Sequence, residues 1–178
     1  MYPEMAIREL TVNMLIHQGF AEQGFPMVEI YSDRIEISNL GLPLISVEHF
    51  IDEYQSRNDS LSDIMRRMGI CEETGSGMDT TIFIIELYQL PHCVFKSKKT
   101  GQQLPSLSYR KFAQIDRGEC IGVCYQHACL RYVSNEKMNN QSLRTRLGVE
   151  DKNYPMASRI IKDTLEAKLI KEESQNGA

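Results

Sequence analysis

The sequence predicts a mixed α/β protein of the α+β kind, with an all-α segment at its C-terminal end. Two short segments around Ser32 and Asp33 alternate apolar and polar residues, which is typical of a β-hairpin. From residue 113 onward, apolar residues instead recur mainly at helical spacing. With 42% hydrophobic and 25% charged residues, the composition is that of a globular protein.

Helices are expected on both sides of the hairpin in the first half of the chain. Gly19, Gly69 and Pro91 each follow an apolar helical pattern and mark its end. The predicted elements of this half are helices over 6–19, 47–54, 60–68 and 77–90 and strands over 27–31 and 34–38. The basic stretch 96–105 is either a loop between two modules or an exposed hairpin.

The second half predicts a helix over 119–133, a short helix over 141–147 capped by Asn140, a turn, a longer helix over 154–167 and a strand from Leu169 to Lys171. This order is that of a winged helix-turn-helix. The sequence therefore predicts two domains, one over residues 1–112 and an all-α winged helix-turn-helix domain over 113–178.

Double-stranded DNA is the partner expected for the second domain. Arginine can read guanine edges bidentately, while lysine mostly contacts phosphate. The candidate DNA-binding residues are Ser142, Arg144, Arg146, Ser158, Arg159 and Lys162. The alternative is a solvated amphipathic helix in a winged helix that serves protein interaction or homo-oligomerisation.

The distribution of charge also supports a division of the chain into two modules. Residues 1–95 hold 5 Lys+Arg and 15 Asp+Glu, a net charge of −10, whereas residues 96–178 hold 15 and 9, a net charge of +6. An acidic first half and a basic second half suggest two modules with different partners.

Several features indicate a cytoplasmic protein. No apolar run approaches the ~20 residues of a membrane span, and the N-terminal residues lack the pattern of a signal peptide. Five cysteines, an odd number without disulfide-framework spacing, are expected to be reduced thiols. Cys120, Cys124, His127 and Cys129 share one predicted helix, which cannot wrap a tetrahedral zinc ion, so these residues are expected to pack in a core.

Glu9, Asn13 and His17 are spaced by four residues and share one face of the first predicted helix. Two interpretations remain open. In the first, the three residues form an exposed polar face of the helix. In the second, Glu9 activates water while the amide oxygen of Asn13 holds a cation such as Mg²⁺.

Gly75, Ser76 and Gly77 precede a predicted helix, where free backbone N–H groups can bind phosphate. A simple capped helix start is the alternative. The sequence has no Walker A motif, so it gives no support to a conventional helicase motor.

These residues together resemble a known family. The resemblance rests on Tyr2-Pro3, Ala6 to Glu9, Asn13, His17, Asp33 to Pro43, Ser56-Arg57-Asn58, Glu73 to Gly77, Cys124 to Leu130, Asn140 to Arg144, Ser158 to Lys162 and Leu169 to Lys171. The chain resembles the C-terminal region of proteins labelled RecG-related ATP-dependent DNA helicases. Those proteins are transcriptional regulators with a histidine-kinase-like (GHKL) ATPase fold and, upstream, an AlbA-like (Schlafen-type) domain.

The resemblance implies an ATP and Mg²⁺ site. By position, Glu9 would activate water, Asn13 would hold Mg²⁺, and His17 lies on the same helix face. The segment of Asn39 and Gly41 would lie near adenine. The segment of Arg57 and Asn58 would correspond to the ATP lid. The loop of Gly75, Ser76 and Gly77 would contact the phosphates. The usual Asp-x-Gly-x-Gly motif is missing, and Asn39 stands where an aspartate is usual.

The resemblance also refines the fold and function. The first domain is expected to be a GHKL ATPase-like two-layer sandwich, although residues 1–95 are short for a complete one. The expected function is DNA-binding transcription regulation with an ATP-binding domain, in a fragment of a larger protein. The alternatives are a Mg²⁺-dependent ATPase of the GHKL type and an interaction or dimerisation module that binds no nucleotide.

Overall fold

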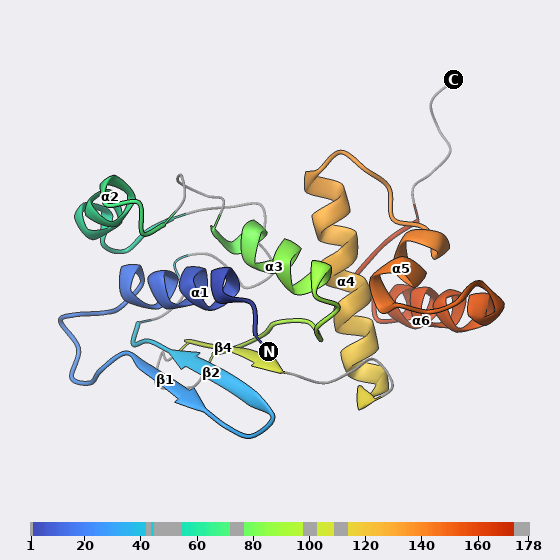
Figure 1. The fold of residues 1–178 in the computed structure, drawn as a ribbon, viewed down its shortest axis with the longest axis horizontal. Helices are drawn as coiled ribbons and strands as arrows, with labels where there is room; N and C mark the ends of the chain where they lie inside the picture. The colour runs from blue at the N-terminus through green and yellow to red at the C-terminus, as the bar shows by residue number, and fades with distance from the viewer. Residues whose placement is uncertain are drawn as a thin grey trace.

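The computed structural model describes residues 2–41, 44, 55–71, 77–97, 103–108 and 114–172. A small sheet covered by helices forms one part, and three helices form the other (Figure 1). The elements in chain order are α1 (Glu4–Ile16), β1 (Met27–Ile30), β2 (Arg34–Ser38), α2 (Asp59–Arg67), α3 (Gly77–Leu87), β3 (Val94–Ser97), β4 (Gln103–Ser108), α4 (Arg117–Val133), α5 (Asn140–Leu147), the 3₁₀ turn η3 (Asp151–Asn153) and α6 (Tyr154–Glu166).

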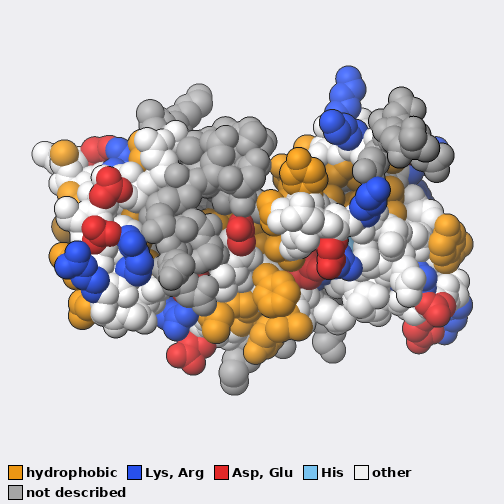
Figure 2. All heavy atoms as spheres, turned by 90° about the horizontal axis from the view of Figure 1, so that it is seen from above, with side chains coloured by type: hydrophobic (Ala, Val, Ile, Leu, Met, Phe, Trp, Pro, Cys, Tyr) orange, Lys and Arg blue, Asp and Glu red, His pale blue; other side chains and the backbone are white. Residues whose placement is uncertain are grey.

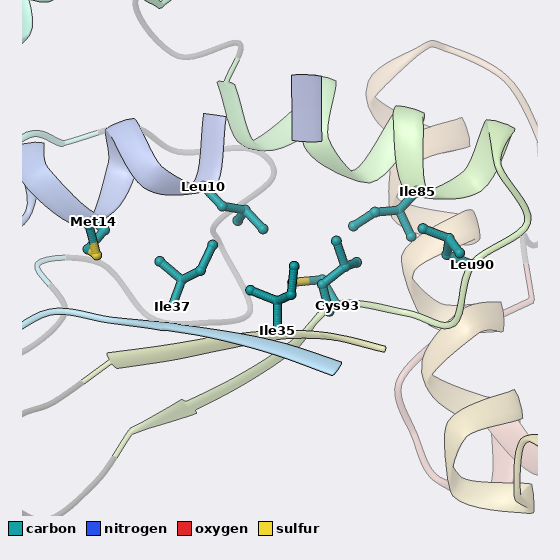
Figure 3. Packing of buried hydrophobic residues seen from close by; sticks show 8 residues of the cluster. Leu10, Met14, Ile35, Ile37, Ile85, Leu90 and Cys93 are labelled. Atoms are coloured by element: carbon teal, nitrogen blue, oxygen red, sulfur yellow. The ribbon is translucent and has the colours of Figure 1, made fainter. Parts of the chain in front are cut away.

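The described strands form one antiparallel sheet in the order β1-β2-β4-β3. Helices α1 and α3 lie on the same face of this sheet, as Figure 1 shows. Ile35 and Ile37, two residues apart on β2, point from the sheet toward these helices and pack with Leu10 and Ile85 (Figure 3). Between them, Glu36 belongs to the opposite face, where it accepts a hydrogen bond from Arg34. The sheet is therefore apolar toward α1 and α3 and polar on its other face.

A second core lies among α4, α5 and α6 and is built around Val123, Cys124, Leu143 and Ile160. The helices around it have well-formed ends. Asp116 and Glu119 form a capping box at the start of α4, and Gly148, with φ of +63°, ends α5 in the left-handed conformation that glycine favours.

Most predicted elements of the first half are confirmed. The hairpin forms with Val28 opposite Ile37, and the three described helices end within three residues of the expected positions. The basic stretch includes parts of two paired strands, β3 and β4, which agrees with the hairpin alternative. The helix predicted over 47–54 lies outside the described residues.

In the second half the three helices are confirmed, with one shift and one error. Asn139, rather than Asn140, is the N-cap of α5. The strand predicted at Leu169–Lys171 is wrong: these residues follow the left-handed Lys168 without regular structure. A strand of three residues needs a partner, and within the described ranges every strand belongs to the sheet of the first half. The winged helix-turn-helix is therefore not confirmed, and the domain boundary at 112/113 stays a prediction.

No helix in the described part of the chain is long and apolar enough to cross a membrane.

Candidate functional site at the end of helix α1

The C-terminal end of α1 is held by side-chain amides from distant parts of the chain. The last carbonyls of a helix have no intrahelical partner. Asn58 donates from Nδ2 to the carbonyl oxygens of Ile16, at 2.6 Å, and Gln18, at 2.9 Å. Asn39 donates from Nδ2 to the carbonyl of His17 at 3.0 Å. Two of the predicted ligand-binding asparagines thus use their amide N–H groups to fix this helix end.

The segment after β2 is bound to the same helix end. The buried Gln18 accepts the backbone N–H of Leu40 at its Oε1, at 2.9 Å, and the N–H of Gly19 donates to the Leu40 carbonyl at 2.7 Å. Because both bonds are made to Leu40, the neighbouring Gly41 is fixed against the end of α1.

Gly41 and Arg57 are in close contact. Gly41 has φ of +113°, and a Cβ at this position would lie 3.1 Å from Cζ of Arg57. Only glycine adopts this conformation readily and leaves room for the guanidinium. Burial, followed by the positive charge of Arg57, lowers the pKa of His17. His17, Asn39, Gly41, Arg57 and Asn58, which are far apart in the sequence, therefore meet at one end of α1.

Glu9 and Asn13 lie further toward the start of α1, with Asn13 one turn before His17. The side chain of Glu9 is only 2% exposed, and its Oε1 accepts from Nε and Nη2 of Arg8 at 3.3 and 3.1 Å. Asn13 is partly exposed. The carboxylate predicted to activate water is therefore buried and already paired with a guanidinium.

Helix α3, whose first residue is Gly77, packs along α1. Gly75 and Ser76, the other two residues of the predicted phosphate-binding loop, lie outside the described residues.

The predicted DNA-binding residues are in different environments. Arg159 and Lys162 are exposed on α6, and Nζ of Lys162 lies 3.9 Å from Oε1 of Glu166. Ser158 accepts from Nδ2 of Asn140 at 2.8 Å, and Arg144 donates to Oδ1 of Asn140 at 2.9 Å and also pairs with Asp151. Of these four predicted residues, Arg159 and Lys162 are the ones presented to solvent.

Arg146 requires a correction. It is only 7% exposed, donates from Nη2 to the Leu90 carbonyl at 2.6 Å, and places Nε 3.6 Å from Oε2 of Glu86. Burial lowers its pKa to about 10, although Glu86 opposes the shift. The structure thus gives Arg146 an internal role and not the predicted contact with DNA. Its spacing from Leu143, three residues earlier on the same helix face, was a sequence signal for burial.

Arg146 belongs to a polar seam between the two halves of the molecule, formed by Glu86 of α3, His127 of α4, and Ser142 and Arg146 of α5. His127, only 2% exposed, places Nδ1 2.8 Å from Oε1 of Glu86 and Nε2 3.0 Å from Oγ of Ser142. Ser142, another predicted DNA-binding residue, also belongs to the capping box of α5. The sequence analysis did not predict the roles of Glu86 and His127, because their contact joins residues 41 positions apart.

Two of the α4 cysteines, Cys120 and Cys124, lie at the second core as expected. Cys124 is fully buried in the second core, and Cys120 packs against that core. Among the described residues, no group of three or more histidine, cysteine or acidic side chains is arranged to hold a metal ion.

Comparison with known proteins identifies the first half. Residues 24–104 match the family model described as "Putative ATP-dependent DNA helicase recG C-terminal". This segment is similar to that family. The RecG-related segment contains β1, β2, α2, α3 and β3, together with Asn39, Gly41, Arg57 and Asn58. Its family supports an ATPase-like, nucleotide-binding type of domain. No curated protein matches the chain.

A solved structure extends the likeness to both halves. The crystal structure of the DIP2311 protein from Corynebacterium diphtheriae superposes with a TM-score of 0.58 at 14% identity. The match covers 90% of this chain and 36% of that one, so the chain spans about a third of the solved protein's length. At this identity the likeness shows a shared fold alone.

Proposed function

We propose that the RecG-related segment, together with α1, binds an adenine nucleotide with Mg²⁺, and that the helical half contacts double-stranded DNA as part of a transcription regulator. The meeting of His17, Gly41 and Arg57 at the end of α1 carries the nucleotide half of this proposal. A basic guanidinium beside a glycine without a side chain suits a phosphate-bearing ligand.

The residues present fit such a ligand in chemical type. The amide oxygen of Asn13, partly exposed on α1, is a hard ligand suited to Mg²⁺. The first backbone N–H groups of α3, which begins at Gly77, and the charge of Arg57 would bind phosphate oxygens. Mg²⁺ would neutralise phosphate charge when bound. Asn39 would act indirectly, since its Nδ2 donates to the His17 carbonyl.

The geometry favours a domain that binds the nucleotide but does not hydrolyse it rapidly. The negative charge of Glu9 is balanced by Arg8, so the carboxylate is poorly prepared to take a proton from water. The rival is a Mg²⁺-dependent ATPase in which Glu9 acts as base. ATP turnover above the buffer rate that Glu9→Ala abolishes, with binding intact, would favour the rival.

Contact with DNA is proposed for the exposed side of α6, through Arg159 and Lys162. The helix also carries Asp163 and Glu166, so its formal charge is zero. Binding should accordingly be weak and should fall as salt rises. A helical half that serves only dimerisation would leave labelled duplex DNA unbound at low salt. Helicase activity forms no part of the proposal.

Isothermal titration of the protein with Mg²⁺-ATP tests the nucleotide half. We expect heat of binding for the wild type, little for Asn13→Ala, and wild-type behaviour for Asn153→Ala, which removes an exposed amide from the turn η3 of the helical half. Fluorescence anisotropy with duplex DNA tests the other half. The double change Arg159→Ala plus Lys162→Ala should weaken binding and reduce its salt dependence.

A further inference from the structure

An open groove of about 510 Å³ lies where α3, α4 and α5 meet. This volume is within the range of ~300–1,000 Å³ common for small-molecule sites, which occur preferentially where two parts of a protein join. The groove belongs to neither hydrophobic core and lies away from the end of α1. It is therefore a candidate site distinct from the proposed nucleotide site.

One wall of the groove is apolar although it faces solvent. Phe83 and Leu87 of α3 line it and are 54% and 66% exposed. Hydrophobic side chains gather near the middle of the face seen in Figure 2, between the two ends of the molecule. An apolar wall inside a concave site favours a ligand with a flat, apolar body.

The remaining walls are polar and carry one more positive than negative charge. Arg131 and Arg146 line the groove against a single carboxylate, Glu86. Glu86 already faces Arg146 at 3.6 Å and His127 at 2.8 Å, so its charge is balanced within the seam. Arg131 pairs with Glu136, whose side chain is 52% exposed. An ion pair open to water contributes little, so a ligand carboxylate can replace Glu136.

We propose that this groove binds a small aromatic carboxylate. Its carboxylate pairs with the guanidinium of Arg131, which offers a planar donor pair, and its ring lies on Phe83 and Leu87. Gln141, on the α5 side, supplies a further amide. Such a ligand touches α3, α4 and α5 at once and fastens the two halves together. The proposal is independent of nucleotide or DNA binding.

A two-dimensional ¹H–¹⁵N NMR titration of the full chain with benzoate tests the proposal, with benzyl alcohol as the uncharged match. We expect benzoate to shift the amide signals around Phe83, Arg131 and Gln141 in a saturable manner, and benzyl alcohol to bind about tenfold more weakly, as the loss of a charge-assisted hydrogen bond predicts.

Four variants locate the site. Arg131→Gln and Phe83→Ala should each weaken benzoate binding by about tenfold. The controls Arg159→Gln and Phe25→Ala change residues of the same types that are exposed elsewhere, and they should bind benzoate as the wild type does. Phe83 is exposed and the Arg131 side chain is 34% exposed, so the variants should stay folded, which the dispersion of the same spectra reports.

Three results would overturn the proposal. These are equal binding of benzoate and benzyl alcohol, unchanged benzoate affinity in both Arg131→Gln and Phe83→Ala, and signal shifts that centre on Phe25 and strand β1 instead of the groove.

Discussion

The end of α1 and the seam between the halves are both polar clusters, but they are built in opposite ways. At the end of α1, neutral amides of Asn39 and Asn58 bind backbone carbonyls. At the seam, the charged or titratable groups of Glu86, His127 and Arg146 face one another. The first arrangement fixes a backbone and leaves a charged side chain, Arg57, beside a glycine. The second uses its charges internally to join the two halves.

This difference suggests which cluster tolerates change and which carries function. Removing one partner of a buried charge network leaves the other partner uncompensated, whereas losing a neutral amide removes only hydrogen bonds. We therefore expect substitutions in the seam to act mainly on stability, and substitutions at the open side of α1 to act mainly on ligand binding.

The largest expected effect is that of Arg146→Ala. It leaves Glu86 and the Leu90 carbonyl without the guanidinium and should lower the free energy of unfolding by about 3 kcal/mol. Urea denaturation measures this value. The control Arg159→Ala, an exposed arginine of the same half, should change stability by less than about 0.5 kcal/mol. Equal effects would show that the seam does not hold the halves together.

Gly122→Ala should also loosen the junction. A Cβ at Gly122 would lie 2.4 Å from Nε2 of His92, so the imidazole must move away from α4. We expect a loss of roughly 1–3 kcal/mol, typical of overpacking. The double variant Gly122→Ala plus His92→Ala should lose less than the two single changes added together, because the clash is then removed. Strict additivity in thermal or urea unfolding would argue against this contact.

A smaller loss is expected for Asn58→Ala, at about 1–2 kcal/mol, because the carbonyls of Ile16 and Gln18 lose their amide partner. Asn13→Ala, one turn earlier on α1 and partly exposed, should change the unfolding free energy by less than about 0.5 kcal/mol. If Asn13→Ala proved the more destabilising of the two, the division between a fixed helix end and an open binding side would be wrong.

The smallest effect concerns pH. Burial and Arg57 lower the pKa of His17, so the unfolded chain takes up a proton more readily than the folded protein. This contribution to stability is present above the ordinary histidine pKa and is lost as the pH falls below it. Arg57→Gln should raise the pKa of His17 in an NMR titration of its ring protons. An unchanged value would place Arg57 away from His17.

The sequence predicted the elements better than the contacts. Period-two alternation gave the hairpin of β1 and β2, and helical spacing gave α1, α3 and α4, since both patterns are local. The bonds from Asn39 and Asn58 to the end of α1 span 22 and 42 positions, beyond the reach of a local pattern. The strand expected at Leu169 failed for the same reason, because a strand depends on a partner elsewhere in the chain.

Arg146 shows a different kind of error. Its residue type suggested DNA, whereas its position three residues after the buried Leu143 on α5 indicated burial, and position decided the outcome. Of the residues predicted for the nucleotide site, five meet at the end of α1, namely His17, Asn39, Gly41, Arg57 and Asn58. Glu9 and Asn13 lie nearer the start of α1, Gly77 begins α3, and Gly75 and Ser76 lie outside the described residues.

The most direct test of the account is thermal unfolding with and without Mg²⁺-ATP, compared between Asn13→Ala and Arg146→Ala. Nucleotide at 100 times its dissociation constant should stabilise the wild type by about 2.7 kcal/mol. We predict that Asn13→Ala, without nucleotide, unfolds at the same temperature as the wild type but gains no stabilisation from Mg²⁺-ATP. Arg146→Ala should unfold at a lower temperature but gain the same stabilisation from Mg²⁺-ATP as the wild type. No increment in the wild type at millimolar Mg²⁺-ATP, or an undiminished one in Asn13→Ala, would contradict the assignment of the end of α1 as a nucleotide site.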